Sequence, residues 1–182
     1  GRTGGMGAIN FLRELTYQYL RLVHFEELKG VPDTLCSDTS LNKEDSYVKN
    51  YKKSYAKGYK TKRAYLIKGE KLRPLELGVM HGYMPVSQLK QTAKSYGLSI
   101  NEYLVAVFIY SVYREGLHGA PCNKPISVPV PVNLRPYYNS ITTKNFFVMV
   151  SAVFDPDREG YTFEEIAAIT AESLRSQIIP EH

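Results

Sequence analysis

The chain has 182 residues, of which 43% are apolar and 23% charged. This composition is ordinary for one globular domain or for a large part of a two-domain protein. No apolar run reaches the length of a membrane span, so the sequence argues against an integral membrane protein. Two cysteines, Cys36 and Cys122, are too few for a disulfide framework, and we expect free thiols and a cytoplasmic protein. The four histidines show no metal-ligand spacing, so no metal is expected.

The net charge of +5 comes from one segment. Residues 47–63 carry seven basic residues and no acid, with Tyr47, Tyr51, Tyr55 and Tyr59 at four-residue steps. Rings and lysines together are typical of single-stranded nucleic-acid binding, and the same lysines suit the phosphates of coenzyme A. We favour a plainer interpretation, in which the segment is a connector whose tyrosines pack on the domain surface. A nucleic-acid partner is therefore not expected.

The first half of the chain alternates between periodic and irregular segments. Apolar residues at three- and four-residue steps predict a helix over residues 7–23. The polar stretch 24–46 is typical of a connection. Residues 63–68 and 75–83 are predicted as strands, and a helix is expected over 86–96. A capping box at Ser99 and Glu102 opens a further helix, residues 100–113, which is apolar nearly all round and therefore expected to be central and buried.

The second half predicts two strands and a final helix. Residues 124–134 form the first strand, and because Pro129 and Pro131 cannot donate to a ladder, it should lie at an edge or be bulged. Residues 145–154 form the second. Thr162 and Glu165 make another capping box, which starts a helix through about residue 178.

Polar residues lie at the end of the first of these two strands and at the start of the second, and a site at these strand ends is therefore expected. Asn133 and Arg135 end one apolar run, and Asn145 opens the next. A buried guanidinium needs a partner. For Arg135 the residues leave open a structural ion pair at a domain seam, a site-shaping ion pair or a substrate contact, and both asparagines are also turn formers. His81 is interpreted as a structural histidine rather than a catalytic base, and His24 as a cation at a helix end.

Three stretches resemble the condensation-domain and chloramphenicol-acetyltransferase-like superfamily. Residues 89–108 are similar to its helix pair. The strand motif of its bacterial alcohol acetyltransferase-like members resembles Val130-Pro131-Val132-Asn133-Leu134-Arg135 with Asn145-Phe146-Phe147. Residues 4–12 resemble the end of its catalytic H-x-x-x-D-G motif and the start of the helix after that motif. The resemblance implies an α/β fold, with a mixed sheet packed with helices in a two-subdomain sandwich.

Aligned in this way, Gly5 matches the motif glycine, and Gly4 stands where the family has an aspartate. The catalytic histidine would fall immediately before Gly1, so we expect the chain to be a middle fragment without a catalytic residue of its own. By motif, Arg135 matches the arginine that pairs with that aspartate. The implied organisation is a helix in residues 1–24, a polar and basic crossover connection in 25–62, and a partial C-terminal half-domain in 63–182.

The resemblance implies an acyltransferase that moves an acyl group from coenzyme A, or from a carrier-protein thioester, onto an alcohol or amine. The thioester would be a co-substrate rather than a bound cofactor. Gly5, Asn133, Arg135 and Asn145 are expected to shape the tunnel, and the chain alone is expected to be inactive. The alternative is a non-catalytic condensation-like module that binds a protein partner.

Overall fold

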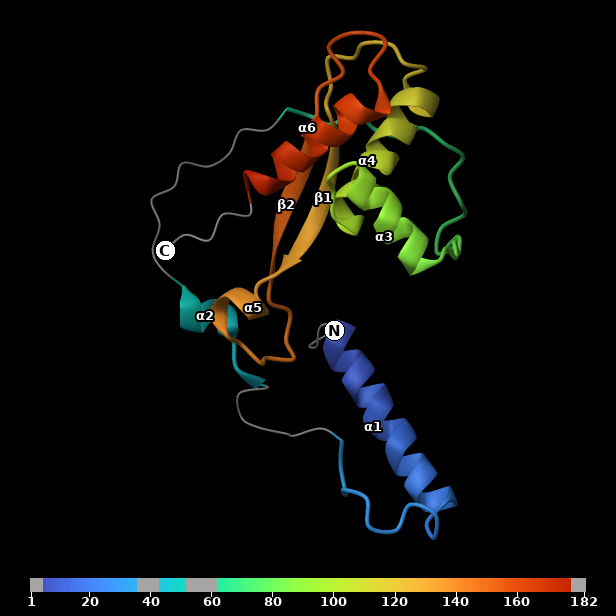
Figure 1. The fold of residues 1–182 in the computed structure, drawn as a ribbon, viewed down its shortest axis with the longest axis vertical. Coiled ribbons are helices and arrows are strands. Elements are labelled where there is room, and N and C mark those ends of the chain that lie inside the picture. Colours follow the sequence, from blue (N-terminus) through green and yellow to red (C-terminus); the bar gives the residue numbers. More distant parts are fainter. Residues whose placement is uncertain (1–4, 36–42, 52–61, 178–182) are drawn as a thin grey trace. The chain divides into compact units, whose positions relative to one another are not determined.

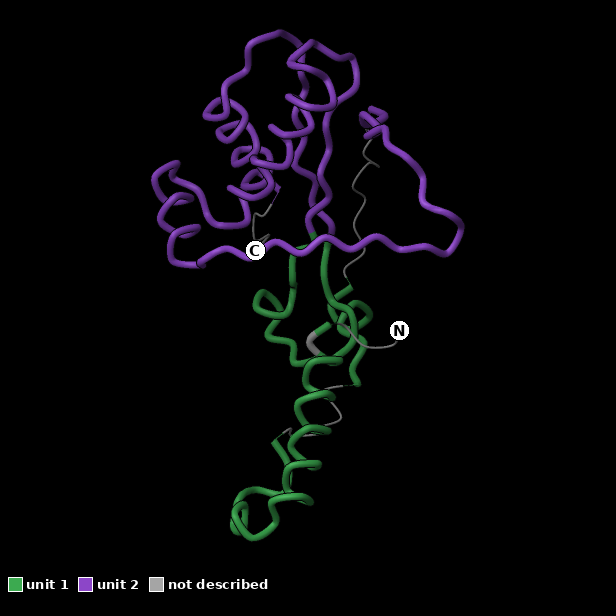
Figure 2. Tube along the Cα trace, turned by 90° about the vertical axis from the view of Figure 1, so that its right-hand side faces the viewer, with its two compact units in different colours: residues 1–56, 131–148 green, residues 57–130, 149–182 purple. Residues whose placement is uncertain are grey.

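The computed structural model describes residues 5–35, 43–51 and 62–177 (Figure 1). The chain divides into two units, each assembled from two stretches (Figure 2). Unit 1 comprises Gly1–Ala56 and Pro131–Val148, and unit 2 comprises Lys57–Val130 and Met149–His182. The unit boundary after Ala56 falls within the predicted crossover connection, 25–62.

The described residues of unit 1 form the helices α1 (Gly5–Val23), α2 (Ser46–Asn50) and α5 (Arg135–Tyr138). The predicted helix over residues 7–23 is confirmed as α1. The chain after α1 folds back along its last turns, where Arg21 pairs with Asp33 over 2.6 Å and Tyr17 Oη donates to the carbonyl of Pro32 over 2.6 Å. The apolar stripe of α1 is nevertheless exposed along its length, at Ile9, Leu12, Leu15, Tyr19 and Leu22.

Unit 2 contains α3 (Val86–Ser95), α4 (Ile100–Ser111) and α6 (Phe163–Arg175). Both predicted capping boxes are confirmed. In each, the hydroxyl of Ser99 or Thr162 accepts the amide of the glutamate three residues later, and that glutamate side chain accepts the amide of the cap residue. A π-helical turn, η2 (Val112–Gly116), extends α4 and brings the Tyr113 ring into the core.

The described sheet is a two-stranded antiparallel ribbon of β1 (Ile126–Asn133) and β2 (Phe147–Phe154). Its outer edge along β2 is occupied by side chains at the end of α6 and just beyond it. Gln177 exchanges hydrogen bonds with both backbone groups of Ser151 (3.1 and 2.8 Å), and Ser173 Oγ accepts the amide of Val153 (3.1 Å). These side chains take the place of a third strand and protect the edge. Among the described residues the proline-bearing β1 pairs with β2 alone, so it is an edge strand, as predicted.

The core of unit 2 lies where α4, α6 and the ribbon meet. Alternate β2 residues Val150, Ala152 and Phe154 are buried, as the two-residue period of a half-covered strand requires. The helices contribute buried faces, chiefly Val105, Ala106, Ile109, Ile166, Ala167, Ala171 and Leu174. Rings of Tyr113, Phe154 and Tyr161 contact one another edge to face at 4.9–5.9 Å, which closes the end of this core.

Two expectations are corrected. Residues 63–68 and 75–83 form no strand, because no neighbouring strand pairs with them in the described chain; one backbone bond, from the Tyr65 amide to the Pro125 carbonyl (2.8 Å), anchors the segment beside β1. Helix α4 is buried on one face only, since Leu104 and Phe108 on its other face are exposed. The mixture of helices and strands is confirmed, but the described sheet is a two-stranded ribbon and not a larger mixed sheet.

Candidate functional site: the end of the β1–β2 ribbon

The predicted site residues of the strand motif lie where β1 ends and β2 begins, within unit 1. β1 ends at Asn133, and Pro136 favours the first turn of α5 directly afterwards. Asn139 ends α5 in the left-handed conformation (φ 46°), to which asparagine is well suited. The Leu134 amide donates to the Phe146 carbonyl over 3.1 Å. The two motif segments, residues 130–135 and 145–147, therefore lie side by side at one end of the ribbon.

Arg135 is held by neutral acceptors. Its Nε donates to the carbonyl of Thr142 over 2.7 Å, and its Nη1 donates to Oδ1 of Asn133 over 3.0 Å. A short hydrogen bond joins Nη2 to the carbonyl of Lys144. The same Asn133 oxygen also accepts the Arg135 amide at 3.2 Å. A guanidinium carries several N–H donors in one plane. Here these donors hydrogen-bond to backbone carbonyls of the loop between α5 and β2.

These contacts identify the partners of Arg135. In residues 5–35, 43–51 and 62–177, no carboxylate lies within ion-pair distance of its guanidinium, so neither predicted ion pair is present there. The arginine instead connects the strand end to the carbonyls seven and nine residues further on. Its chemistry at this position is that of a loop clamp, which fixes the direction in which β2 starts.

A second set of contacts, which sequence reasoning missed, secures the same loop from α2. Ser46 Oγ lies 2.7 Å from Ser140 Oγ, and Thr142 Oγ1 donates to the Glu44 carbonyl over 2.7 Å. The Tyr47 hydroxyl accepts the Phe147 amide over 2.8 Å and forms a short bond with the carbonyl of the same residue. The regular tyrosine spacing was the available signal. The predicted packing of these tyrosines on the domain surface is confirmed for Tyr47, whose ring contacts Phe146, and is not seen for the exposed Tyr51.

The structure brings together two of the four predicted site residues. Asn133 and Arg135 are bonded to each other, whereas Asn145 is an exposed residue just before β2, and Gly5 is the exposed first residue of α1. Neither Asn145 nor Gly5 has a hydrogen bond to the clamp among the described contacts. Most of the basic stretch, residues 52–61, lies outside the described residues, as does Cys36; Tyr51 is exposed, and Cys122 is a half-buried free thiol.

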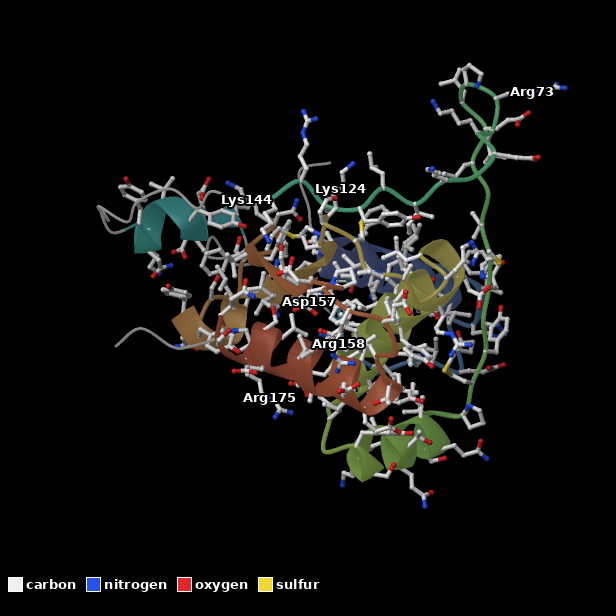
Figure 3. The ribbon with its side chains drawn as sticks, turned by 90° about the horizontal axis from the view of Figure 1, so that it is seen from above. Arg73, Lys124, Lys144, Asp157, Arg158 and Arg175 are labelled. Carbon is white, nitrogen blue, oxygen red and sulfur yellow. The ribbon has the colours of Figure 1, made fainter. Side chains whose placement is uncertain are left out.

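The titratable groups with the firmest partners lie in unit 2. Hydrogen bonds from Arg175 hold the pKa of the Glu102 carboxyl below its usual range, and the amide of Ser99 adds to this effect. The Tyr161 hydroxyl donates to Asp157, which raises the pKa of the tyrosine. Asp157 and Arg158 are labelled in Figure 3, and the guanidinium of Arg158 lies 3.9 Å from the Tyr161 ring. These groups bind one another, so the geometry assigns them a structural role.

The histidines differ from expectation in one case. His24 follows α1 and lies 3.3 Å from Glu27, in keeping with its predicted place at a helix end. His81 is exposed and stacks on Tyr83 (6.4 Å between ring centroids), so the prediction of a satisfied structural histidine in a strand is wrong. In the part of the chain that is described, no three His, Cys, Asp or Glu side chains gather in a way that could hold a metal ion.

Comparison with known proteins gives no relative to set beside this site. No family model, no curated protein and no solved structure matches the chain. A search of the described helices for one long and apolar enough to cross a bilayer found none.

Proposed function

We propose that this chain is part of an acyltransferase of the condensation-domain and chloramphenicol-acetyltransferase-like superfamily. It would contribute to moving an acyl group from coenzyme A, or from a carrier-protein thioester, onto an alcohol or amine. The proposal includes a two-subdomain sandwich as the complete fold and the cytosol as the place of action.

The observation that carries the proposal is the hydrogen bond between the Leu134 amide and the Phe146 carbonyl. The strand motif consists of two segments separated in sequence, and the resemblance requires them to be neighbours at one strand end. The bond between these segments supports the proposal. Arg135 supports the same interpretation because it organises the wall beside this strand end through Asn133, Thr142 and Lys144.

Acyl transfer requires groups beyond those of the strand motif. Transfer from a thioester needs a base for the acceptor hydroxyl or amine and donors for the tetrahedral oxyanion. The resemblance assigns the base to a histidine immediately before Gly1. Asn133 and Arg135 are then positioning residues, since Oδ1 of Asn133 is bonded to Arg135 and the Arg135 guanidinium is bonded to Asn133 and to the loop.

The test measures release of free thiol from acetyl-coenzyme A and longer acyl-coenzyme A esters, with a small alcohol or amine as acceptor. The protein is expressed from the gene together with the sequence preceding Gly1, beside a version in which the residue directly before Gly1 is changed to alanine. We expect turnover in the first protein and background release in the second. A residue other than histidine at that position, or equal turnover in both proteins, would contradict the proposal.

The second candidate is a non-catalytic module of the same superfamily that binds a protein partner such as an acyl carrier protein. It is favoured by Gly4, which stands where the family has an aspartate, and by the exposed apolar residues of unit 2, such as Leu104 and Phe108. Titration with an acylated carrier protein distinguishes the two: binding with no thiol release supports the module, and thiol release supports the enzyme.

A further inference from the structure

One stretch of unit 2 lies open to solvent along its whole length. Every residue from 66 to 88 is exposed, and the exposed fraction reaches 100% at Met80 and 92% at Tyr83. The stretch contains no strand and becomes helical only where α3 begins, at Val86. In Figure 3 the loop that carries Arg73, which belongs to this stretch, stands away from the other side chains. We call residues 66–88 the exposed segment.

The apolar side chains of the exposed segment present more area than a free surface normally carries. Ten large apolar residues are exposed in it, among them Leu75, Leu77 and Met80. At roughly 100 Å² each, they present on the order of 1,000 Å² of surface. The largest apolar patch on a soluble monomer is about 300–600 Å². An apolar surface of this size marks a site of interaction with a protein or a membrane.

The apolar side chains lie on both sides of the backbone, which favours a membrane. Alternate residues of an extended chain face opposite ways, and the rings of His81 and Tyr83 stack on one side with an interplanar angle of 14°. Val79 belongs to the same side, whereas Met80 and Met84 belong to the other. A flat protein surface would cover one side and leave the other in water. A lipid interface surrounds an inserted segment and covers both sides.

Basic residues flank the exposed segment and outnumber the acids. Residues 62–94 carry seven lysines and arginines against two glutamates, and all nine are exposed. On α3, Lys90 and Lys94 follow Val86 at four-residue steps, so one exposed face of this helix continues the apolar surface with two cations. Apolar side chains bordered by lysine and arginine are complementary to an anionic lipid surface, to which each cation near the headgroups adds attraction.

The backbone indicates how deep such a segment lies. No backbone hydrogen bond between described residues involves the amides of 77–84. Unpaired amides are costly in the hydrocarbon core of a bilayer. At the level of the headgroups, water and phosphate oxygens can accept them, and a tyrosine such as Tyr83 is also favoured there.

We propose that the exposed segment docks unit 2 on the surface of an anionic bilayer. The apolar side chains between Leu72 and Met84 insert at the level of the headgroups, and the flanking lysines and arginines contact the lipid phosphates. The segment lies on one leaflet and does not cross the bilayer. The inference does not depend on the proposed transferase activity, because no residue of the β1–β2 ribbon end takes part.

The first experiment measures co-sedimentation of the purified chain with phosphatidylcholine vesicles, prepared with and without phosphatidylglycerol. We expect binding to the vesicles that contain phosphatidylglycerol, and Met80→Asp should weaken it about ten-fold or more. Leu22→Asp makes the same charge change at an exposed apolar residue of unit 1 and should leave binding unchanged. Three results would each overturn the proposal: no binding to the anionic vesicles, equal binding to both kinds of vesicle, or equal losses in the two variants.

The same assay tests the contribution of charge. Lys90→Gln removes one cation beside the segment and should raise the dissociation constant for anionic vesicles about five-fold. Lys29→Gln, at a lysine of unit 1 whose side chain is 70% exposed, is the matched control and should have no effect. If the two variants bind equally well, the cations of α3 do not face the lipid and the proposed docking is wrong.

A tryptophan probe tests which residues enter the lipid. The chain has no tryptophan, so Met80→Trp introduces a single one. Its emission should shift to the blue when anionic vesicles are added and should be quenched by lipids brominated in their acyl chains. Leu22→Trp should show neither change. Unchanged emission from Met80→Trp in a chain that co-sediments would show that another surface binds the vesicles, against the proposal.

The longer protein of the activity test, which includes the sequence preceding Gly1, distinguishes a lipid partner from coverage by protein. We expect it to bind anionic vesicles as the present chain does, and its Met80→Trp emission should shift only when lipid is added. Emission that is already blue-shifted without lipid, together with loss of vesicle binding, would show that protein covers the exposed segment and would overturn the proposal. Thiol release is measured separately, so failure of the docking leaves the transferase test unaffected.

Discussion

Arg175 and Glu102 form a two-pronged ion pair that ties the end of α6 to the first turn of α4. Nε of Arg175 lies 2.7 Å from Oε1 of Glu102, and Nη2 lies 3.0 Å from Oε2. The same carboxylate accepts the Ser99 amide over 2.7 Å as part of the capping box. The Glu102 side chain is only 12% exposed. One carboxylate therefore serves both the start of a helix and the packing between two helices.

This pair makes the stability of unit 2 sensitive to acid. The folded-state pKa of Glu102 lies below its ordinary value of 4.5, because Arg175 and the Ser99 amide bind the charged form. The stabilisation is thus fully present above that ordinary value and is lost as the pH falls through the folded-state pKa. We expect Glu102→Gln to lower the free energy of unfolding by about 1–2 kcal/mol at pH 7 and to flatten its decline below pH 4.5. Urea unfolding followed by circular dichroism from pH 7 to pH 3 measures both effects.

The matched control for Glu102→Gln is Glu172→Gln, which removes the same charge from an exposed position on α6. Its effect on unfolding at pH 7 should be within about 0.5 kcal/mol of zero. Arg175→Ala should reproduce the flattened acid profile of Glu102→Gln. An unchanged profile in both of those variants would show that the pair contributes nothing to acid sensitivity.

The clamp of Arg135 predicts a strong difference between arginine and lysine. Lys at this position keeps the charge but has a single nitrogen, which cannot reach the carbonyls of Thr142 and Lys144 and the side-chain amide of Asn133 together. Arg135→Lys should cost about 1–3 kcal/mol locally and increase hydrogen exchange of the Leu134 amide about ten-fold or more. Lys144→Met, which leaves the Lys144 carbonyl in place, is the control. Equal hydrogen exchange of the Leu134 amide in Arg135→Lys and Lys144→Met would contradict the role of Arg135 as a loop clamp.

The hydroxyl of Tyr47 secures the first peptide group of β2. Tyr47→Phe removes the acceptor of the Phe147 amide but preserves the edge-to-face contact with Phe146, whose ring centroid lies 5.0 Å away. We expect a loss of about 0.5–1.5 kcal/mol, measured as faster hydrogen exchange of the Phe147 amide. The comparison variant is Tyr51→Phe, since Tyr51 is 75% exposed and its change should have no effect. If the Phe147 amide is as well protected from hydrogen exchange in Tyr47→Phe as in the parent, the hydroxyl of Tyr47 does not secure the start of β2.

Local signals in the sequence predicted the elements that depend on local physics. The capping boxes at Ser99 and Thr162 involve residues three positions apart, so the pattern contains the whole interaction. The predicted strand at residues 75–83 had an equally clear alternation, but a strand requires a partner, and nothing in the alternation identifies one. The error there concerns pairing and not periodicity.

The candidate site shows the same difference between local signals, which the sequence contains, and distant partners, which it does not identify. The break in the apolar run was enough to place Asn133 and Arg135 at a strand end. The partners of Arg135 include backbone carbonyls, which every residue carries, so no residue type marks them in advance. The contacts of Ser46 and Tyr47 were missed for another reason: the tyrosine spacing singled out Tyr47 but not its partner, since Ser140 and Phe147 lie 94 and 100 residues away in the sequence.

Thr170 on α6 offers a stabilising substitution. Its side chain is fully buried, and its Oγ1 has no hydrogen-bond partner among the described residues. A buried hydroxyl without a partner carries a desolvation penalty, and threonine and valine have nearly the same shape and helix propensity. Thr170→Val should therefore raise the free energy of unfolding by about 1 kcal/mol, seen as a higher midpoint in urea with an unchanged slope. Thr170→Ser, which keeps the hydroxyl and loses a methyl group, should lower it. A destabilised Thr170→Val would mean that the hydroxyl has a partner in solution, such as a buried water.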